Sequence, residues 1–487
     1  MLIENFSFNL NPGDKAAIIG EEGNGKSTLL QLMHDEKYVL DYCEYTGQII
    51  RKGRTAYLPQ FFSESNSTLE EYFSDTTVFQ NPQILNQLRL PFEITTSSQL
   101  VDTLSGGEKI KIQLAKILLQ EPDIFLLDEP SNDIDIAALE WLEKFIGSLA
   151  QPIIFISHDE TLIEATANTI IHIEQLMRKT KCKITTHHMG YAEYISARNL
   201  AHRKQTQIAQ KQRSDHKAPM EKWQQVYNKV NHEQRVVSRQ DPGTARLLKK
   251  KMKAVKSTGK RLEKKSKDFL DIPEMEEAIL TKFDPKIIVP SGKVILSLAL
   301  PELRVNEQNG KKLSENINLN IHGAQRIGII GANGVGKSTL LKKIWDELRC
   351  REDVVAGYMP QDYTEVLDYN KSVIDYVTED SHKDTITKAR TFLGAMKFTS
   401  DEMLSKISCL SGGQKAKLLF LSFVLKNANV LILDEPTRNF SPLSAPEIRK
   451  TLADFGGAII SVSHDRKYLK EVCDSVFEMN VNGLVLL

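Results

Sequence analysis

The residues with the clearest chemical signature form two copies of the pattern G-x-x-x-x-G-K-S, at Gly20–Ser27 and Gly331–Ser338. Glycines let consecutive backbone N–H groups face into one loop and bind phosphate oxygens. The lysine reaches the terminal phosphates, and the serine hydroxyl ligates Mg²⁺. In the first copy an apolar run at Ala16–Ile19 predicts a strand before the loop, and Thr28–Met33 predicts a helix after it. The pattern therefore predicts two sites for nucleotide phosphates.

Two acidic pairs, Asp128–Glu129 and Asp434–Glu435, follow the apolar runs IFLL and VLIL. The aspartate is suited to the Mg²⁺ shell, and the glutamate one residue later can take a proton from an attacking water. Gln60 and Gln361 are placed to bridge the metal and this water. The predicted metal ligands are Ser27, Gln60, Asp128, Ser338, Gln361 and Asp434.

Two histidines, His158 and His464, follow further apolar runs and are predicted to contact the γ-phosphate. Together with Glu129 and Glu435 they form the predicted catalytic set. A solitary histidine is more often structural, but its position at a strand end favours the functional interpretation.

A third element, LSGG, opens a predicted helix at Ser105 and again at Ser411, where backbone amides at a helix N-terminus can bind an anion. The motifs recur in the same order at nearly constant spacing: 306 positions separate Ser105 from Ser411, Asp128 from Asp434, and His158 from His464. Such spacing indicates an internal duplication. The predicted nucleotide-binding residues are Gly20, Glu21, Glu22, Gly23, Asn24, Gly25, Lys26, Ser27, Thr28, Ser105, Gly106, Gly107, Glu108, Gly331, Ala332, Asn333, Gly334, Val335, Gly336, Lys337, Ser338, Thr339, Ser411, Gly412, Gly413 and Gln414.

The ordered motifs resemble the nucleotide-binding domain of ATP-binding cassette proteins. In that family LSGG contacts the ATP held by the opposite domain, so the resemblance implies two composite ATP and Mg²⁺ sites. One would pair Lys26 with Ser411–Gln414, and the other Lys337 with Ser105–Glu108. Ser441 stands where the first copy has Asp135, so we expect the second half to be slower or less coupled.

The aromatic residue that stacks on adenine in this family is not evident in either copy. We expect the first copy to lack the strand that carries it, and the second has Val305 or its neighbours there. Nucleotide selectivity is therefore left open.

Length and composition set the architecture. The 487 residues, 41% hydrophobic and 26% charged, fit two large α/β domains and a connector. We predict tandem cassettes at 1–185 and 289–487, each a mixed sheet flanked by helices, with a linker at 186–288. No apolar run approaches the roughly 20 residues of a membrane span. Five scattered cysteines, without metal-ligand spacing, and an N-terminus unlike a signal peptide favour a cytoplasmic protein.

The linker carries the charge. Between Arg198 and Asp268 there are twenty-one Lys and Arg against six Asp and Glu, an excess of fifteen, although the whole chain has no net formal charge. The pattern predicts a basic helical hairpin with its tip near residues 233–243. Trp223 and Tyr227 would pack against Leu247, Met252 or Val255, or else stack on a nucleobase.

Over nearly its whole length the chain resembles the ABC-F subfamily of bacterial translation factors and ribosome-protection proteins. The resemblance implies a monomer with intramolecular cassette pairing, associated with the ribosome at the exit-tRNA site. Its partners would be ribosomal RNA and the P-site tRNA, with no membrane partner. Clustered cations fit such a polyanion, because binding releases its counterions. The candidate RNA contacts are Arg235, Arg239, Arg246, Lys249, Lys250, Lys251 and Lys253.

Several functions remain open within this interpretation. Antibiotic resistance by ribosome protection is favoured over drug-independent rescue of stalled ribosomes. If the chain were the ATPase subunit of a transporter, the basic hairpin would have no evident role. A DNA-repair ATPase would usually add CxxC pairs or far longer coiled coils, and the sequence has neither.

Overall fold

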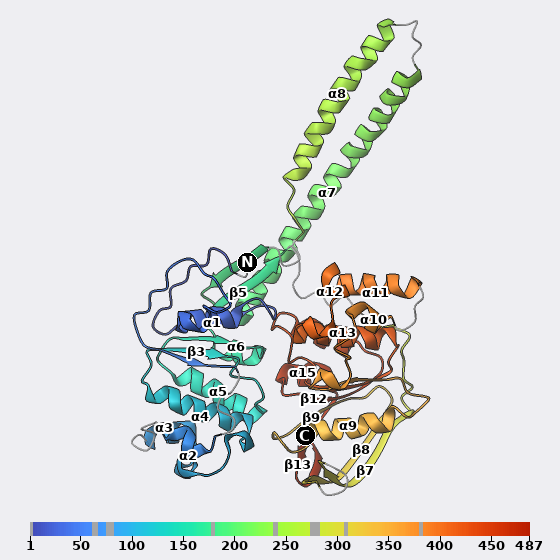
Figure 1. Ribbon diagram of the computed structural model, residues 1–487. Coiled ribbons are helices and arrows are strands. Elements are labelled where there is room, and N and C mark those ends of the chain that lie inside the picture. Colours follow the sequence, from blue (N-terminus) through green and yellow to red (C-terminus); the bar gives the residue numbers. More distant parts are fainter. Residues whose placement is uncertain are drawn as a thin grey trace. The chain divides into compact units, whose positions relative to one another are not determined.

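The computed structural model describes residues 3–60, 67–74, 82–176, 181–236, 242–272, 283–305, 310–378 and 383–487. The chain forms two compact units. The first, Met1–Tyr191 with Glu276–Leu487, holds both cassettes, and the second, Ala192–Met275, is the helical linker (Figure 1). The predicted α/β class with two cassettes joined by a long basic helical hairpin is confirmed.

The first cassette is built on a six-stranded sheet in the order β2-β3-β4-β1-β5-β6. Its strands are parallel except for β6, which pairs antiparallel with β5, so the sheet is mixed as predicted. Its strands and α-helices are β1 (Lys15–Ile19), α1 (Lys26–His34), β2 (Thr55–Leu58), α2 (Leu69–Phe73), α3 (Pro82–Leu88), α4 (Gly106–Leu119), β3 (Ile124–Asp128), α5 (Ile136–Ser148), β4 (Ile153–Ile156), α6 (Glu160–Thr166), β5 (Thr169–Leu176) and β6 (Lys181–His187).

The second cassette repeats this sheet in the order β10-β11-β12-β9-β13-β14 and adds the antiparallel pair β7-β8. The repeat predicted from the motif spacing is thus a repeat of topology. Its strands and α-helices are β7 (Val294–Arg304), β8 (Lys312–His322), β9 (Arg326–Ile330), α9 (Lys337–Leu348), β10 (Ala356–Met359), α10 (Val373–Val377), α11 (Lys383–Ala395), α12 (Ser400–Leu404), α13 (Gly412–Leu425), β11 (Val430–Asp434), α14 (Ala445–Ala453), β12 (Ala458–Val462), α15 (Arg466–Val472), β13 (Ser475–Asn480) and β14 (Gly483–Leu486).

The central strands are short apolar runs buried on both faces, which is typical of parallel sheets covered by helices. In β3, Phe125, Leu126 and Leu127 are all buried, and β11 is buried throughout. Because neighbouring strands run parallel, their carboxyl ends meet at one edge of each sheet. Asp128 and Asp434 end β3 and β11, so the burial of these strands fixes the acidic residues in place.

The linker unit is a pair of helices, α7 (Tyr191–Val236) and α8 (Pro242–Lys267). Pro242 begins α8, a position where its missing N–H costs no hydrogen bond. Residues 237–241, which include part of the predicted tip and Arg239, lie outside the described residues. The other six candidate RNA contacts are all exposed, whereas Leu248, Met252 and Val255 line the buried side of α8.

Trp223 and Tyr227 pack inside the hairpin. They contact a cluster of Val230, Met252 and Val255, as predicted for the last two. Leu247, the third predicted partner, is 69% exposed, so that expectation was wrong. One position along, Leu248 takes the buried side of the helix because its spacing to Met252 is four residues.

A glycine makes room for this packing. A Cβ at Gly259 would lie 2.6 Å from Cζ2 of Trp223. The Trp223 indole N–H donates to the Val255 carbonyl over 2.8 Å. The indole ring of Trp223 therefore packs between α7 and α8. This packing argues against the alternative that the ring stacks on a nucleobase.

We expect Trp223→Ala to lower the opening free energy of the hairpin by about 2–3 kcal/mol, because it removes aromatic packing and one hydrogen bond. Amide hydrogen exchange in α8 should speed up accordingly. Leu247→Ala on the same helix is the control, since its exposed side chain should leave exchange within about threefold of the parent. Equal exchange in the two variants would contradict this packing.

Candidate functional site

The two phosphate loops have the same geometry. Each loop glycine that follows a strand has a positive φ, 149° at Gly20 and 147° at Gly331. A Cβ there would meet a backbone carbonyl oxygen at 2.4 Å and 2.3 Å respectively, so only glycine fits. Each loop ends where its helix begins, at Lys26 in α1 and Lys337 in α9.

Both loop lysines are buried and bend back over their own loops. The Lys26 ammonium donates to the carbonyls of Gly20 at 2.9 Å and Glu21 at 3.0 Å. Lys337 donates to Gly331 at 2.8 Å and Ala332 at 3.1 Å. The lysine ammonium therefore lies within the curve of the loop. A bound phosphate would accept hydrogen bonds from this same Nζ atom.

The predicted metal ligands Ser27 and Asp128 are in contact, since the Ser27 hydroxyl donates to Asp128 Oδ1 over 3.0 Å. The Tyr57 hydroxyl donates to the other carboxylate oxygen, also over 3.0 Å. The sequence analysis did not identify Tyr57, which lies on β2, three residues before Gln60. Burial raises the pKa of Asp128 to about 6.

In the second cassette burial likewise raises the pKa of Asp434, and a hydrogen bond from Ser338 opposes the shift. Asp434 Oδ2 is buried without a hydrogen-bond partner among the described residues. A hydroxyl and a carboxylate with an unused oxygen fit Mg²⁺, which takes one or two protein oxygens and completes its shell with phosphates and water. Gln60 and Gln361 are exposed on the loops after β2 and β10 and do not reach these aspartates by any hydrogen bond described.

Both predicted general bases have an unusual backbone. Glu129 and Glu435 have φ of 49° and 50°, in the left-handed region that non-glycine residues rarely adopt. Their amides are nevertheless hydrogen-bonded, Glu129 to the Ile156 carbonyl at 3.1 Å and Glu435 to Val462 at 2.9 Å. This conformation costs about 1 kcal/mol or more at each residue, and such strain is concentrated at functional sites.

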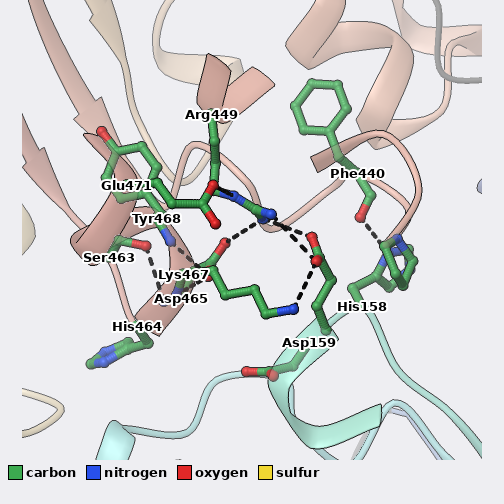
Figure 2. A network of polar contacts seen from close by, with 12 residues as sticks. His158, Asp159, Phe440, Arg449, Ser463, His464, Asp465, Lys467, Tyr468 and Glu471 are labelled. Atoms are coloured by element: carbon green, nitrogen blue, oxygen red, sulfur yellow. Dashed lines mark hydrogen bonds and ion pairs between the residues drawn. The ribbon is translucent and has the colours of Figure 1, made fainter. Parts of the chain in front are cut away.

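The two histidines differ in their contacts. His158 Nε2 lies 3.1 Å from Glu129 Oε1, and its Nδ1 donates to the Phe440 carbonyl of the second cassette over 2.8 Å (Figure 2). His464 Nε2 lies 3.9 Å from Glu435 Oε1, and its Nδ1 is buried without a hydrogen-bond partner among the described residues. Ile134 lies 306 positions before Phe440, so it is the corresponding residue in the first copy of the repeat.

These contacts move the pKa values in opposite directions. Burial works to raise the pKa of Glu129, but the His158 imidazole outweighs it and holds the pKa below its usual range. Burial, followed by the Asp434 charge, raises the pKa of Glu435 to about 8. Burial and the Lys337 ammonium lower the pKa of His464 to about 4, whereas Glu129 raises that of His158. At neutral pH these shifts favour the ionised form of Glu129 and the protonated form of Glu435.

Each LSGG motif begins a helix with a capping box. Ser105 accepts from the Glu108 amide at the start of α4, and Ser411 accepts from the Gln414 amide at the start of α13. In the first pairing, the Gly413 amide donates to Glu22 Oε2 over 2.7 Å, and Lys417 lies 3.5 Å from Glu21 Oε1. The phosphate loop of one cassette therefore touches the signature helix of the other.

The second pairing contains a cavity of about 1030 Å³. Lys337 and Ser338 of one cassette and Ser105 and Gly106 of the other line it, and Val305 borders it. Asn333, the counterpart of Glu22, donates to the Asp133 carbonyl over 2.7 Å. Arg438 lies 2.8 Å from the Asp133 carboxylate. Comparing the repeats position by position exposes the Glu22/Asn333 difference, which motif matching alone overlooked.

We expect Glu22→Asn to tighten ATP binding at the first site about tenfold, because an anionic phosphate no longer competes with Glu22 for the Gly413 amide. Binding of a fluorescent ATP analogue, measured in a Lys337→Ala background that weakens the second site, checks this.

The reciprocal Asn333→Glu variant, in a Lys26→Ala background, is the matched control and should weaken the second site. If Glu22→Asn binds no more tightly than its parent, the Glu22 contact does not compete with nucleotide.

The family model described as "ABC transporter" matches residues 3–132 and 314–438. The chain is 30% identical over 405 residues to ABC transporter F family member 2 of Arabidopsis thaliana, covering 81% of this chain and 55% of that protein. The chain thus spans about half the length of this plant relative.

A bacterial relative is matched over more of its length. The chain is 28% identical over 484 residues to the ribosome protection protein VmlR of Bacillus subtilis, covering 97% of this chain and 83% of that protein. Among solved structures, RNase-L Inhibitor superimposes with a TM-score of 0.57 at 15% identity, over 98% of this chain and 87% of its own, which shows a shared fold. Among the described residues, no helix combines the length and apolarity needed to cross a bilayer.

Proposed function

The chain belongs to the ABC transporter family and to its ABC-F branch, and on this premise we propose that it is an ATPase that acts on the ribosome. The observation that carries this proposal is the exposed basic hairpin between two cassettes. The relation to a protein named for ribosome protection supports it.

The catalytic step follows from the site geometry. When bound, Mg²⁺ would neutralise charge on the β- and γ-phosphates, with Ser27 and Asp128 or Ser338 and Asp434 as its protein ligands. Lys26 and Lys337 hold the phosphates, and the amides of the opposite signature helix face the γ-phosphate. Glu129 accepts the proton of the attacking water, and Glu435 does so once it is ionised. The backbone amides of His158 and His464 donate to these carboxylates and orient them.

The proposed work of the ATPase is transmitted by cassette closure. Two ATP molecules complete both composite sites and so favour the paired state of the cassettes, which biases the hairpin on the ribosome. Hydrolysis removes this bias and releases the protein. The hairpin would enter the exit-tRNA site and approach the peptidyl-transferase centre, contacting ribosomal RNA and the P-site tRNA in the cytoplasm.

The exposed cations of α8 are suited to this partner. Lys249, Lys250, Lys251 and Lys253 are all exposed, and among them only Lys251 has an ion-pair partner described, Glu233 at 3.9 Å. Cations that point outward around a helix meet phosphates on several sides, unlike the single face of a membrane-surface helix. A transporter subunit would leave these charges without a partner.

The finer role that we propose is antibiotic resistance by ribosome protection. Drug-independent rescue of stalled ribosomes is the alternative, since it uses the same arm and the same ATPase. The two roles differ in whether a drug near the peptidyl-transferase centre is displaced.

A Glu129→Gln/Glu435→Gln double variant is expected to bind ATP without hydrolysing it and to stay on ribosomes, because the paired state persists. Cosedimentation with ribosomes, with ATP and with ADP, measures this. Sedimentation free of ribosomes in the presence of ATP would refute the ribosomal role, and the ATP-free parent serves as the control.

We expect expression of the chain in a sensitive host to raise the inhibitory concentration of at least one among lincosamides, pleuromutilins, streptogramin A and macrolides. A variant with Lys249, Lys250, Lys251 and Lys253 changed to Gln should lose the effect, since about four phosphate contacts are removed. Changing the exposed cassette residues Lys37, Lys52, Lys388 and Lys406 to Gln is the charge-matched control. Unchanged values for all four drug classes would leave stalled-ribosome rescue as the function.

A further inference from the structure

A buried ion-pair cluster joins the two cassettes beside the histidine loops. Arg449 of α14 is 3% exposed, and its Nη1 donates to Glu160 Oε1 of α6, 7% exposed, over 2.6 Å. Lys467 of α15 adds a contact of 3.3 Å to the same carboxylate. Figure 2 shows Arg449 and Lys467 turned toward this point from the second cassette.

A second ion pair crosses the same interface. The Arg466 guanidinium at the start of α15 donates to the Glu143 carboxylate of α5 through both terminal nitrogens, one of them to Oε2 at 3.4 Å. Both side chains are partly buried, with 24% of Arg466 and 17% of Glu143 exposed. Two guanidinium–carboxylate pairs therefore connect the cassettes. One joins α14 to α6, and the other joins α15 to α5.

The internal repeat relates these two pairs. Counting 306 positions from Glu143 leads to Arg449, and counting 306 from Glu160 leads to Arg466. The same two positions therefore meet twice across the interface, but the first cassette supplies both carboxylates and the second supplies both guanidinium groups. The duplication kept the contact and gave the two copies opposite charges.

Two copies of the same cassette could not form these ion pairs. Two first cassettes in the same arrangement would place Glu143 against Glu160, and two second cassettes would place Arg449 against Arg466. A buried charge without its partner costs several kcal/mol, and like charges add repulsion. Only the pairing of unlike cassettes gives each of these four residues an opposite charge across the interface.

The charges around the two ion pairs differ between the cassettes. The first cassette adds Glu140 and Asp159 near Arg466, and Glu164 lies 2.7 Å from Lys467. Arg449 keeps two carboxylates of its own cassette, Glu471 at 2.7 Å and Asp465 at 3.8 Å. Burial alone would lower the pKa of Arg449, but Glu160 and Glu471 raise it above its usual value, so the group stays charged.

We propose that this charge exchange is a recognition device that permits a first cassette to pair only with a second cassette. The composite sites then always join unlike phosphate loops and signature helices. Within one chain the linker makes this pairing intramolecular. Between two copies of the chain, a first cassette cannot pair with the other first cassette, nor a second cassette with the other second cassette. This inference does not depend on the ribosomal function.

The test is a charge-reversal cycle in the full-length chain: Glu143→Arg, Arg466→Glu and the double variant. Each single change faces like charges, so amide hydrogen exchange in α5 and α15 should speed up about tenfold or more. The double variant restores an opposite-charge pair and should return to within about threefold of the parent. Lys450→Glu, an exposed residue of α14, is the control for the added negative charge.

Sedimentation velocity provides a second readout that a merely structural role would not change. Glu143→Arg gives the first cassette one charge of each sign, so two first cassettes become complementary and the chain should self-associate with rising concentration. The parent should remain monomeric over the same range. Exchange in the double variant as fast as in the single variants, or Glu143→Arg that stays monomeric with parental exchange, would overturn the proposal.

Discussion

The structure depends on one set of interactions, in which the phosphate loop of each cassette contacts the opposite cassette beside its signature helix. The Gly413 amide meets the first loop at Glu22, and the Asp133 carbonyl meets the second loop at Asn333. Because the N-terminal amides of a helix have no partners within it, they must face a ligand, a side chain or water. At the first site the Glu22 side chain meets this need, so the contact contributes to the pairing of the cassettes.

The duplicated motifs are equal in type but not in environment. The His158 imidazole reaches a carbonyl of the other cassette and holds Glu129 in its ionised form, whereas His464 has no such contact and Glu435 is buried beside Asp434. The pKa values of the two predicted general bases are therefore shifted in opposite directions, down for Glu129 and up for Glu435. The expected difference in rate between the halves remains a prediction, to which these contacts give a physical basis.

The linker unit solves a different problem, since a strongly basic helix has little apolar surface with which to fold. Among the described residues, one cluster contributes to its stability where Trp223 lies over Gly259 and contacts Met252 and Val255, and the His216 ring packs on Phe269 nearer the cassettes. Confining the packing to one side of α8 leaves the lysines on its other sides available to a polyanion. The arm can thus be folded and densely charged at once.

The sequence by itself determined the tandem α/β cassettes, the order of their motifs and the basic hairpin, because glycine loops, apolar strands and charge runs are local patterns with local physical causes. Helical spacing also predicted the contact of Trp223 with Met252 and Val255, but it placed Leu247 on the wrong side. The family resemblance already paired the first phosphate loop with Ser411–Gln414. Tertiary structure alone decided the particular contacts, such as Glu22 with Gly413 and Arg449 with Glu160. The left-handed backbone of Glu129 and Glu435 and their opposite pKa shifts also required it. Burial, desolvation and contacts between residues hundreds of positions apart leave no local pattern in a chain.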